Sequence, residues 1–106
     1  MLTVTTHQLD DIVVLHCHGR IVRGEEDLLL CEAVQHYGHE VMLDLSDVTV
    51  IDAAGVGALV SLQAAGIYLK LMNPSEPVMT VLRLTGMETV LEIWEREAEL
   101  LKETSG

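Results

Sequence analysis

The chain of 106 residues is long enough for one compact domain and too short for two. Its formal net charge of −11 would repel nucleic-acid phosphates and anionic lipid headgroups, so we expect a protein partner and no nucleic acid. Cys17 and Cys31 lack CxxC spacing and follow no secretory signal, which predicts a cytoplasmic protein with reduced thiols.

The first third of the chain predicts a hairpin followed by a helix. Two β-rich runs, Leu2 to His7 and Ile12 to Gly19, are separated by the polar residues 8–11, as in a hairpin. An acidic segment at 25–27 favours a helix start, and Gly38 is placed to end that helix. Its apolar positions repeat with helical spacing: Leu30, Ala33, Val34 and Tyr37.

The segment Val48 to Leu69 contains a single charged side chain, that of Asp52. This carboxylate is placed to cap a helix, because it can accept hydrogen bonds from free backbone N–H groups at the positive end of the helix dipole. One apolar stripe follows at helical spacing: Val56, Leu59, Val60 and Ala64. A second stripe has very small side chains: Ala54, Gly57, Ala58, Ser61 and Ala65.

A helix face of such small side chains lets another backbone approach closely, and we interpret it as a docking surface. The alternative is that the small residues only allow tight packing on the protein's own sheet. A membrane span is not predicted, because the uncharged run 53–69 is shorter than the ~20 residues that a bilayer requires. We therefore expect no direct membrane insertion.

Strands are predicted on both sides of this helix, at Val41 to Leu45 and Ile67 to Met72. Two strands joined by a helix form a βαβ unit, which is expected to be parallel and right-handed. The strands alternate between apolar and polar positions, so one face of the sheet should stay partly open. The polar positions of that face are His16, His18, Asp44, Tyr68 and Lys70.

The remaining residues predict a third helix, Val78 to Met87, with Ser75 as its N-cap. A short edge strand at Val90 to Trp94 and a final helix at Glu95 to Glu103 should follow, with a frayed end at 104–106. The predicted fold class is α/β: one mixed, mainly parallel sheet of four to five strands with helices mostly on one face. Residues 1–106 would form this single domain.

The sequence offers little evidence of catalysis. The paired histidines His16 and His18, and likewise His36 and His39, have no Cys or carboxylate at a spacing that completes a recognisable ligand set, so we predict no metal site and no cofactor. The serines lack a GxSxG context, and the glycines at 55 and 57 do not form a GxGxxG loop. We therefore predict that the chain is not an enzyme.

The motif I-D-x-x-G-x-x-x-L at Ile51 to Leu59, with the order of the elements around it, resembles the STAS domain of sulphate transporters and anti-sigma factor antagonists. Supporting similarities are His18-Gly19-Arg20-Ile21 and Leu84-Thr85-Gly86-Met87. The resemblance covers nearly the whole chain.

The resemblance implies a protein-binding function. In bacterial family members that antagonise anti-sigma factors, the motif usually reads D-S-[ST]-G, and a partner kinase phosphorylates its second hydroxyl residue to prevent binding. That position is Ala54 here, and Ala53 replaces the other hydroxyl. We therefore expect a constitutive binder, unless phosphorylation occurs at Ser46, Thr49 or Ser61.

By this resemblance, the partner would be an anti-sigma factor of the histidine-kinase-like ATPase type. The expected contact residues surround the start of the second helix: Asp52, Ala53, Ala54, Gly55, Gly57, Ala58 and Ser61. The resemblance leaves two other functions open, a small cytosolic subunit of an ABC-type transporter and a structural scaffold in an assembly of several STAS proteins. A third alternative is a degenerate domain that only forms a homodimer.

Overall fold

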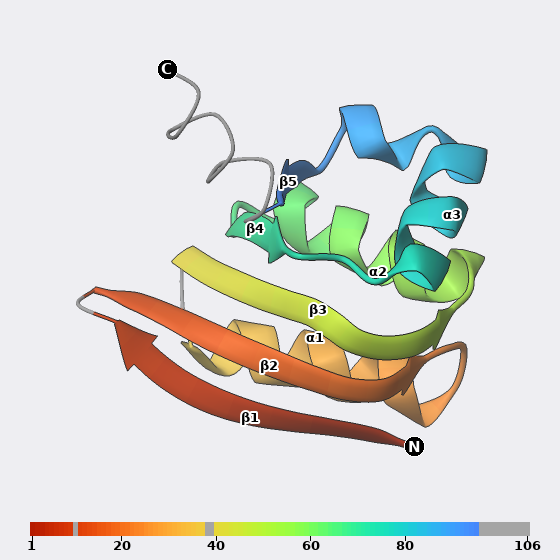
Figure 1. Cartoon of the computed structure of the whole chain (residues 1–106). Helices are drawn as coiled ribbons and strands as arrows, with labels where there is room; N and C mark the ends of the chain where they lie inside the picture. The colour runs from red at the N-terminus through yellow and green to blue at the C-terminus, as the bar shows by residue number, and fades with distance from the viewer. Residues whose placement is uncertain (10, 38–39, 96–106) are drawn as a thin grey trace.

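The computed structural model describes residues 1–9, 11–37 and 40–95, and its five strands form one sheet in the order β1-β2-β3-β4-β5 (Figure 1). β1 pairs antiparallel with β2, and each later pair is parallel. This arrangement confirms the predicted mixed, mainly parallel sheet. The strands are β1 (Leu2–Leu9), β2 (Ile12–Ile21), β3 (Glu40–Ile51), β4 (Tyr68–Met72) and β5 (Glu92–Trp94).

Three α-helices connect the strands: α1 (Glu25–Tyr37), α2 (Ala53–Ala64) and α3 (Glu76–Thr85), with a short 3₁₀ helix, η1 (Met87–Thr89), before β5. Figure 1 shows α1 and α2 behind the strands, against one face of the sheet. The acidic first turn of α1 lies at its start as predicted. Leu30 and Val34 are buried on the side of α1 that faces the sheet. Tyr37, which the spacing placed on the same side, is 39% exposed.

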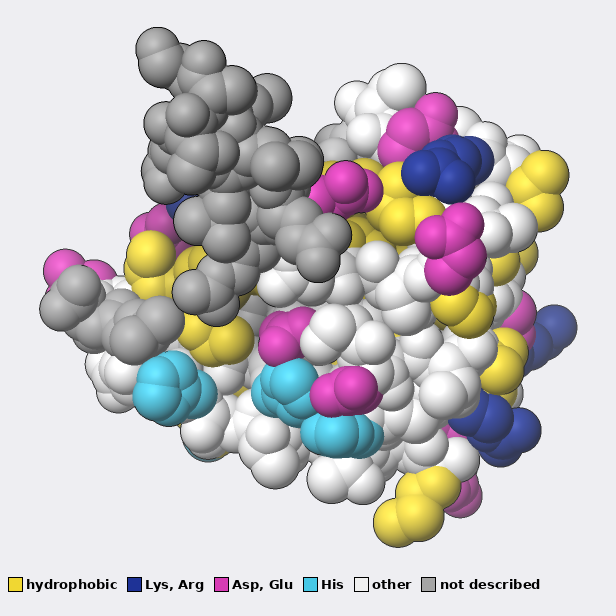
Figure 2. Space-filling view, viewed as in Figure 1, with side chains coloured by type: hydrophobic (Ala, Val, Ile, Leu, Met, Phe, Trp, Pro, Cys, Tyr) yellow, Lys and Arg dark blue, Asp and Glu magenta, His cyan; other side chains and the backbone are white. Residues whose placement is uncertain are grey.

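The core lies between the sheet and the helices. Alternate strand residues point into it, so Leu43 and Leu45 on β3 and Leu69 and Leu71 on β4 are buried. The residues between them face the other side of the sheet, where the polar positions predicted from the sequence lie. Figure 2 shows this face, with histidine and carboxylate side chains packed together on it.

Strand β3 is longer than predicted, because it continues from Glu40 through Ile51 and meets the cap of α2 directly. Ser46 and Thr49, which follow the predicted end of the strand at Leu45, therefore lie in the strand. The pairing of β3 with β2 shifts between His16 and His18, whose partners are Asp44 and Asp47. Such a β-bulge places an extra residue in one strand and redirects the side chains that follow.

The third helix also differs from the prediction, since it spans Glu76–Thr85 rather than Val78 to Met87. Gly86 ends it with a φ of 73°, a left-handed conformation that glycine adopts at helix ends. Ser75 is the N-cap residue, but its hydroxyl donates to the carbonyl of Val48 instead of capping its own helix.

Three predictions for chain segments fall outside the described residues. These are the stop at Gly38, the final helix apart from Glu95, which is not helical, and the frayed end at 104–106. Within the described part of the chain, no helix is both long enough and apolar enough to cross a membrane.

Candidate functional site

Asp52 caps α2 as the sequence predicts. Its backbone is extended, with φ −115° and ψ −177°, and its Oδ1 accepts a hydrogen bond from the backbone N–H of Gly55 at 2.8 Å. The carbonyl of Asp52 accepts the first helical bond, from the N–H of Val56 at 3.0 Å. The local sequence explains this geometry, because a short acidic side chain before small residues satisfies free N–H groups of the first turn.

The same carboxylate also fixes the loop between β2 and α1. Its Oδ2 accepts a hydrogen bond from the backbone N–H of Arg23 at 3.0 Å. The bonds from Arg23 and Gly55 stabilise the charged carboxylate, so they hold the pKa of Asp52 below its usual value. Asp52 therefore caps α2 and also links the start of this helix to the loop between β2 and α1.

Replacing Asp52 with alanine is expected to destabilise the domain by about 1 to 2 kcal/mol at neutral pH, since a cap is lost. Because the folded-state pKa is lowered, the charge of Asp52 contributes stability above the unfolded-state pKa, and this contribution disappears as the pH falls through the folded-state pKa. The melting temperatures of wild type and Asp52→Ala should therefore converge in acid. Asp52→Asn, which keeps a capping oxygen, should lose less; equal loss in both variants would contradict the capping account.

Five predicted contact residues form the surface of α2 that we call the small-residue face: Ala53, Ala54, Gly57, Ala58 and Ser61. Ala53, Gly57 and Ser61 are exposed, while Ala54 and Ala58 are half-buried. A Cβ atom added to Gly57 would meet no other atom within 4 Å. The structure thus brings these residues together on one open surface, which starts at the Asp52 cap.

Gly55 does not belong to this surface, contrary to the prediction. It is buried, and a Cβ atom there would lie 2.3 Å from the carbonyl oxygen of Ile21 and 2.8 Å from Cγ1 of Ile51. The first turn of α2 therefore packs directly on the ends of β2 and β3. Gly55 therefore agrees with the interpretation of tight internal packing, whereas Gly57 leaves an open surface.

The predicted apolar stripe of α2 is shifted by the packing of the helix. Val56 and Leu59 are buried as expected, and Leu62 joins them. Val60 is half-buried and Ala64 is exposed. The helix is apolar on almost every side, so spacing alone could not identify which side faces the sheet.

Two basic residues lie at the end of the sheet where α2 begins. Arg20 and Arg23 are exposed at this end of the sheet, and Arg20 Nη2 lies 3.3 Å from Oε1 of Glu26. Val50, two residues before the Asp52 cap, is 44% exposed. A partner could thus meet small, apolar and charged groups within one region.

The three alternative phosphorylation sites do not gather at one place. Ser61 lies on α2, whereas Ser46 and Thr49 lie on β3. The Ser46 hydroxyl donates to Oδ1 of Asp44 at 2.7 Å, and the Thr49 hydroxyl donates to the carbonyl of Gly19 at 3.2 Å. All three residues are exposed.

A histidine and carboxylate cluster on the open sheet face corrects another expectation. The sequence offered no carboxylate at a recognisable spacing for the histidines, but the bulge in β3 places Asp47 within ion-pair distance of His16 and His18. The missed signal is the pattern of β3, in which two exposed residues, Ser46 and Asp47, separate buried Leu45 and Val48. His36 lies on α1, apart from this cluster, and His39 lies outside the described residues.

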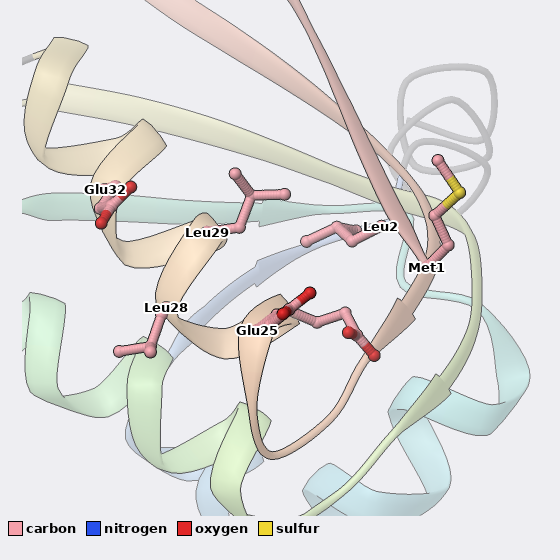
Figure 3. Close-up of a pocket in the computed structure, with 7 residues that line it drawn as sticks. Met1, Leu2, Glu25, Leu28, Leu29 and Glu32 are labelled. Carbon is pink, nitrogen blue, oxygen red and sulfur yellow. The ribbon is translucent and has the colours of Figure 1, made fainter.

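A shallow apolar groove lies between β1 and α1. Figure 3 shows Leu2 and Leu29 pointing toward each other across it, with Met1 at one end and Glu25 and Glu32 on α1. The groove has mixed apolar and acidic walls. It has no part in the small-residue face.

The comparisons with known proteins agree with the geometry. The family model of the STAS domain matches residues 3–100. A Thermotoga neapolitana protein named as an anti-sigma factor antagonist is 32% identical over 72 residues, which span 64% of this chain and 64% of that protein.

Solved structures show the same fold. The crystal structure of TM1081 from Thermotoga maritima, also named as an anti-sigma factor antagonist, has a TM-score of 0.74 and 26% identity, and the match covers 97% of this chain and 95% of that one. The anti-sigma factor antagonist SpoIIAA in its unphosphorylated form has a TM-score of 0.61 at 16% identity, over 98% of this chain and 99% of that one. Because the family model covers nearly all of the sequence and the sheet and helices match those of solved anti-sigma factor antagonists, this chain belongs to the STAS domain family.

Proposed function

We propose that this chain is a non-enzymatic regulator of the anti-sigma factor antagonist type, which binds an anti-sigma factor related to histidine-kinase-like ATPases. The observation that supports this proposal most is the open small-residue face beside the capped start of α2. A surface with few side-chain atoms lets a partner's backbone or helix approach closely. The names of the Thermotoga relatives support the same class of function.

Binding is proposed to be constitutive at this surface. Ala54 occupies the position where the resemblance implies a phosphorylated hydroxyl, and a methyl group cannot accept phosphate. A phosphate there would add about −1.5 to −2 charges next to the Asp52 carboxylate. This repulsion and its desolvation cost would oppose docking, so the alanine keeps the surface in its binding-competent form.

The variant Ala54→Glu tests this proposal, because it places a permanent negative charge at the same position. We expect partner capture to fall at least about tenfold, the equivalent of about 1.4 kcal/mol. The fold should be retained, since an acidic residue in the first turn suits the helix dipole. Binding is measured by capturing the endogenous partner on immobilised protein, and stability by thermal melting.

Ala54→Gln is the matched control, since it has the size of Glu without the charge. If the proposal is right, Ala54→Gln retains more binding than Ala54→Glu. Equal capture by wild type and Ala54→Glu would show that the partner does not contact this turn, and the proposed site would be wrong.

A further inference from the structure

The open face of the sheet contains a cluster that the partner-binding proposal does not use, formed by His16, His18, Asp44 and Asp47. In a regular strand, Asp44 and Asp47 would point to opposite faces, because side chains alternate. The bulge in β3 reverses this alternation, so Asp44 pairs with His16 and Asp47 pairs with His18 on one face. Bulges of this kind often redirect a side chain at a functional site.

The ligand-type atoms of the cluster converge. Oδ2 of Asp47 lies 2.8 Å from Nε2 of His16 and 3.5 Å from Nε2 of His18. One donor atom from each of His16, His18 and Asp47 falls within 4.8 Å of the other two. The two imidazole rings are tilted by 53°, with their centroids 4.6 Å apart. Two imidazoles and a carboxylate therefore face a common point on the surface.

Asp44 holds the nearest histidine in the required orientation. Its Oδ2 lies 2.6 Å from Nδ1 of His16, on the far side of the ring from Asp47. A proton on Nδ1 that is donated to a carboxylate leaves Nε2 as the metal-binding nitrogen, and metal-bound histidines in proteins usually have such a partner. The Ser46 hydroxyl and N–H donate to Asp44 Oδ1, at 2.7 and 3.0 Å, so Asp44 is itself held in place.

The charges of the cluster are not balanced by a basic side chain. In the described part of the chain, the ion pairs of Asp44 and Asp47 are with histidines. The β1 residues opposite His16 and His18 are Thr5 and Thr3, which are uncharged. The hydrogen bond to Asp47 raises the pKa of His16 above its usual value.

We propose that His16, His18 and Asp47 bind a divalent transition-metal ion, with Zn²⁺ as the best match, and that Asp44 positions His16. Imidazole and carboxylate donors suit Zn²⁺, whose tetrahedral bonds of about 2.0 to 2.2 Å separate neighbouring donor atoms by about 3.4 Å. The 3.5 Å between His18 Nε2 and Asp47 Oδ2 already fits this spacing. The 2.8 Å between His16 Nε2 and Asp47 Oδ2 has to lengthen by about 0.6 Å when the metal binds. Water would complete the coordination on the solvent side.

Titration of the metal-free protein with Zn²⁺ tests the proposal. Binding is measured by calorimetry and by comparing the melting temperature with and without Zn²⁺. We expect one Zn²⁺ per chain. Affinity should fall at least about tenfold in His18→Gln and Asp47→Asn, and about 10 to 100-fold in Asp44→Asn, where only the positioning carboxylate is lost. Because protons compete with metal for imidazole nitrogens, affinity should also weaken in acid.

His36→Gln is the matched control, because His36 is an exposed histidine on α1, outside the cluster. Its Zn²⁺ affinity should equal that of wild type. If Asp47→Asn fails to fold by circular dichroism, His18→Gln decides, since its side chain is 53% exposed and its loss leaves the core intact. Absence of stoichiometric Zn²⁺ binding to wild type, or equal affinity of wild type and His18→Gln, would overturn the proposal.

Discussion

Replacing Gly55 with alanine is expected to destabilise the domain by about 2 to 3 kcal/mol, because the added methyl group overfills a packed site. Its Cβ would lie 2.3 Å from the backbone oxygen of Ile21, which cannot rotate away as a flexible side chain would. The end of β2 or the first turn of α2 must shift. That shift would also disturb the Asp52 cap, whose Oδ1 accepts the N–H of Gly55.

Gly57→Ala is the matched control on the same helix, and it should have the opposite effect. The added Cβ meets nothing within 4 Å, and alanine is favoured over glycine in a helix interior by about 1 kcal/mol. For a domain of this size, that gain corresponds to a rise in melting temperature of about 4 to 8 °C. Urea unfolding measures both variants; similar stabilities for Gly55→Ala and Gly57→Ala would contradict the packing described here.

Introducing arginine at Gly57 is expected to abolish partner binding, with a loss of at least about 100-fold in affinity, or about 2.7 kcal/mol. The long charged side chain would cover the small-residue face and would have to be desolvated or displaced before a partner could approach. Stability should be unchanged or higher, because arginine is a better helix former than glycine. If Gly57→Arg loses binding while its melting temperature is at least that of wild type, the loss is due to blocked docking and not to unfolding.

Leu84→Arg controls for the added charge. Leu84 lies on α3, is 82% exposed and is outside the small-residue face. This variant should capture the partner as wild type does. Equal binding by wild type and Gly57→Arg would show that the partner uses another surface, whereas equal losses in Gly57→Arg and Leu84→Arg would indicate a general effect of charge.

The parts of the fold that the sequence predicts well depend on local chemistry. The Asp52 cap follows from one acidic residue before a run of small ones, and the parallel βαβ unit follows from two alternating strands around that helix. The open sheet face follows from polar residues at alternate positions of β2, β3 and β4. Each of these features is determined by residues within a short distance in the chain.

The features that could not be predicted from the sequence depend on contacts between segments that are distant in the chain. Gly55 and Gly57 look alike in the sequence, and only the backbone of Ile21, far away in the chain, makes one buried and the other exposed. The hydroxyl of Ser75 donates to the carbonyl of Val48 rather than capping its own helix, because β3 passes beside the start of α3. In the same way, Asp47 meets two histidines through the register of β2 against β3.

Affinity purification of the tagged chain from lysate of its own source, with mass spectrometry of both partner and bait, tests the proposed function most directly. Gly57→Arg serves as a parallel bait. We predict that wild type recovers a histidine-kinase-like ATPase, that Gly57→Arg does not, and that the recovered bait lacks phosphate at Ser46, Thr49 and Ser61. Recovery of a permease with its ATPase would instead indicate a transporter subunit, recovery of other STAS proteins would indicate a scaffold, and phosphate on the bait would contradict constitutive binding.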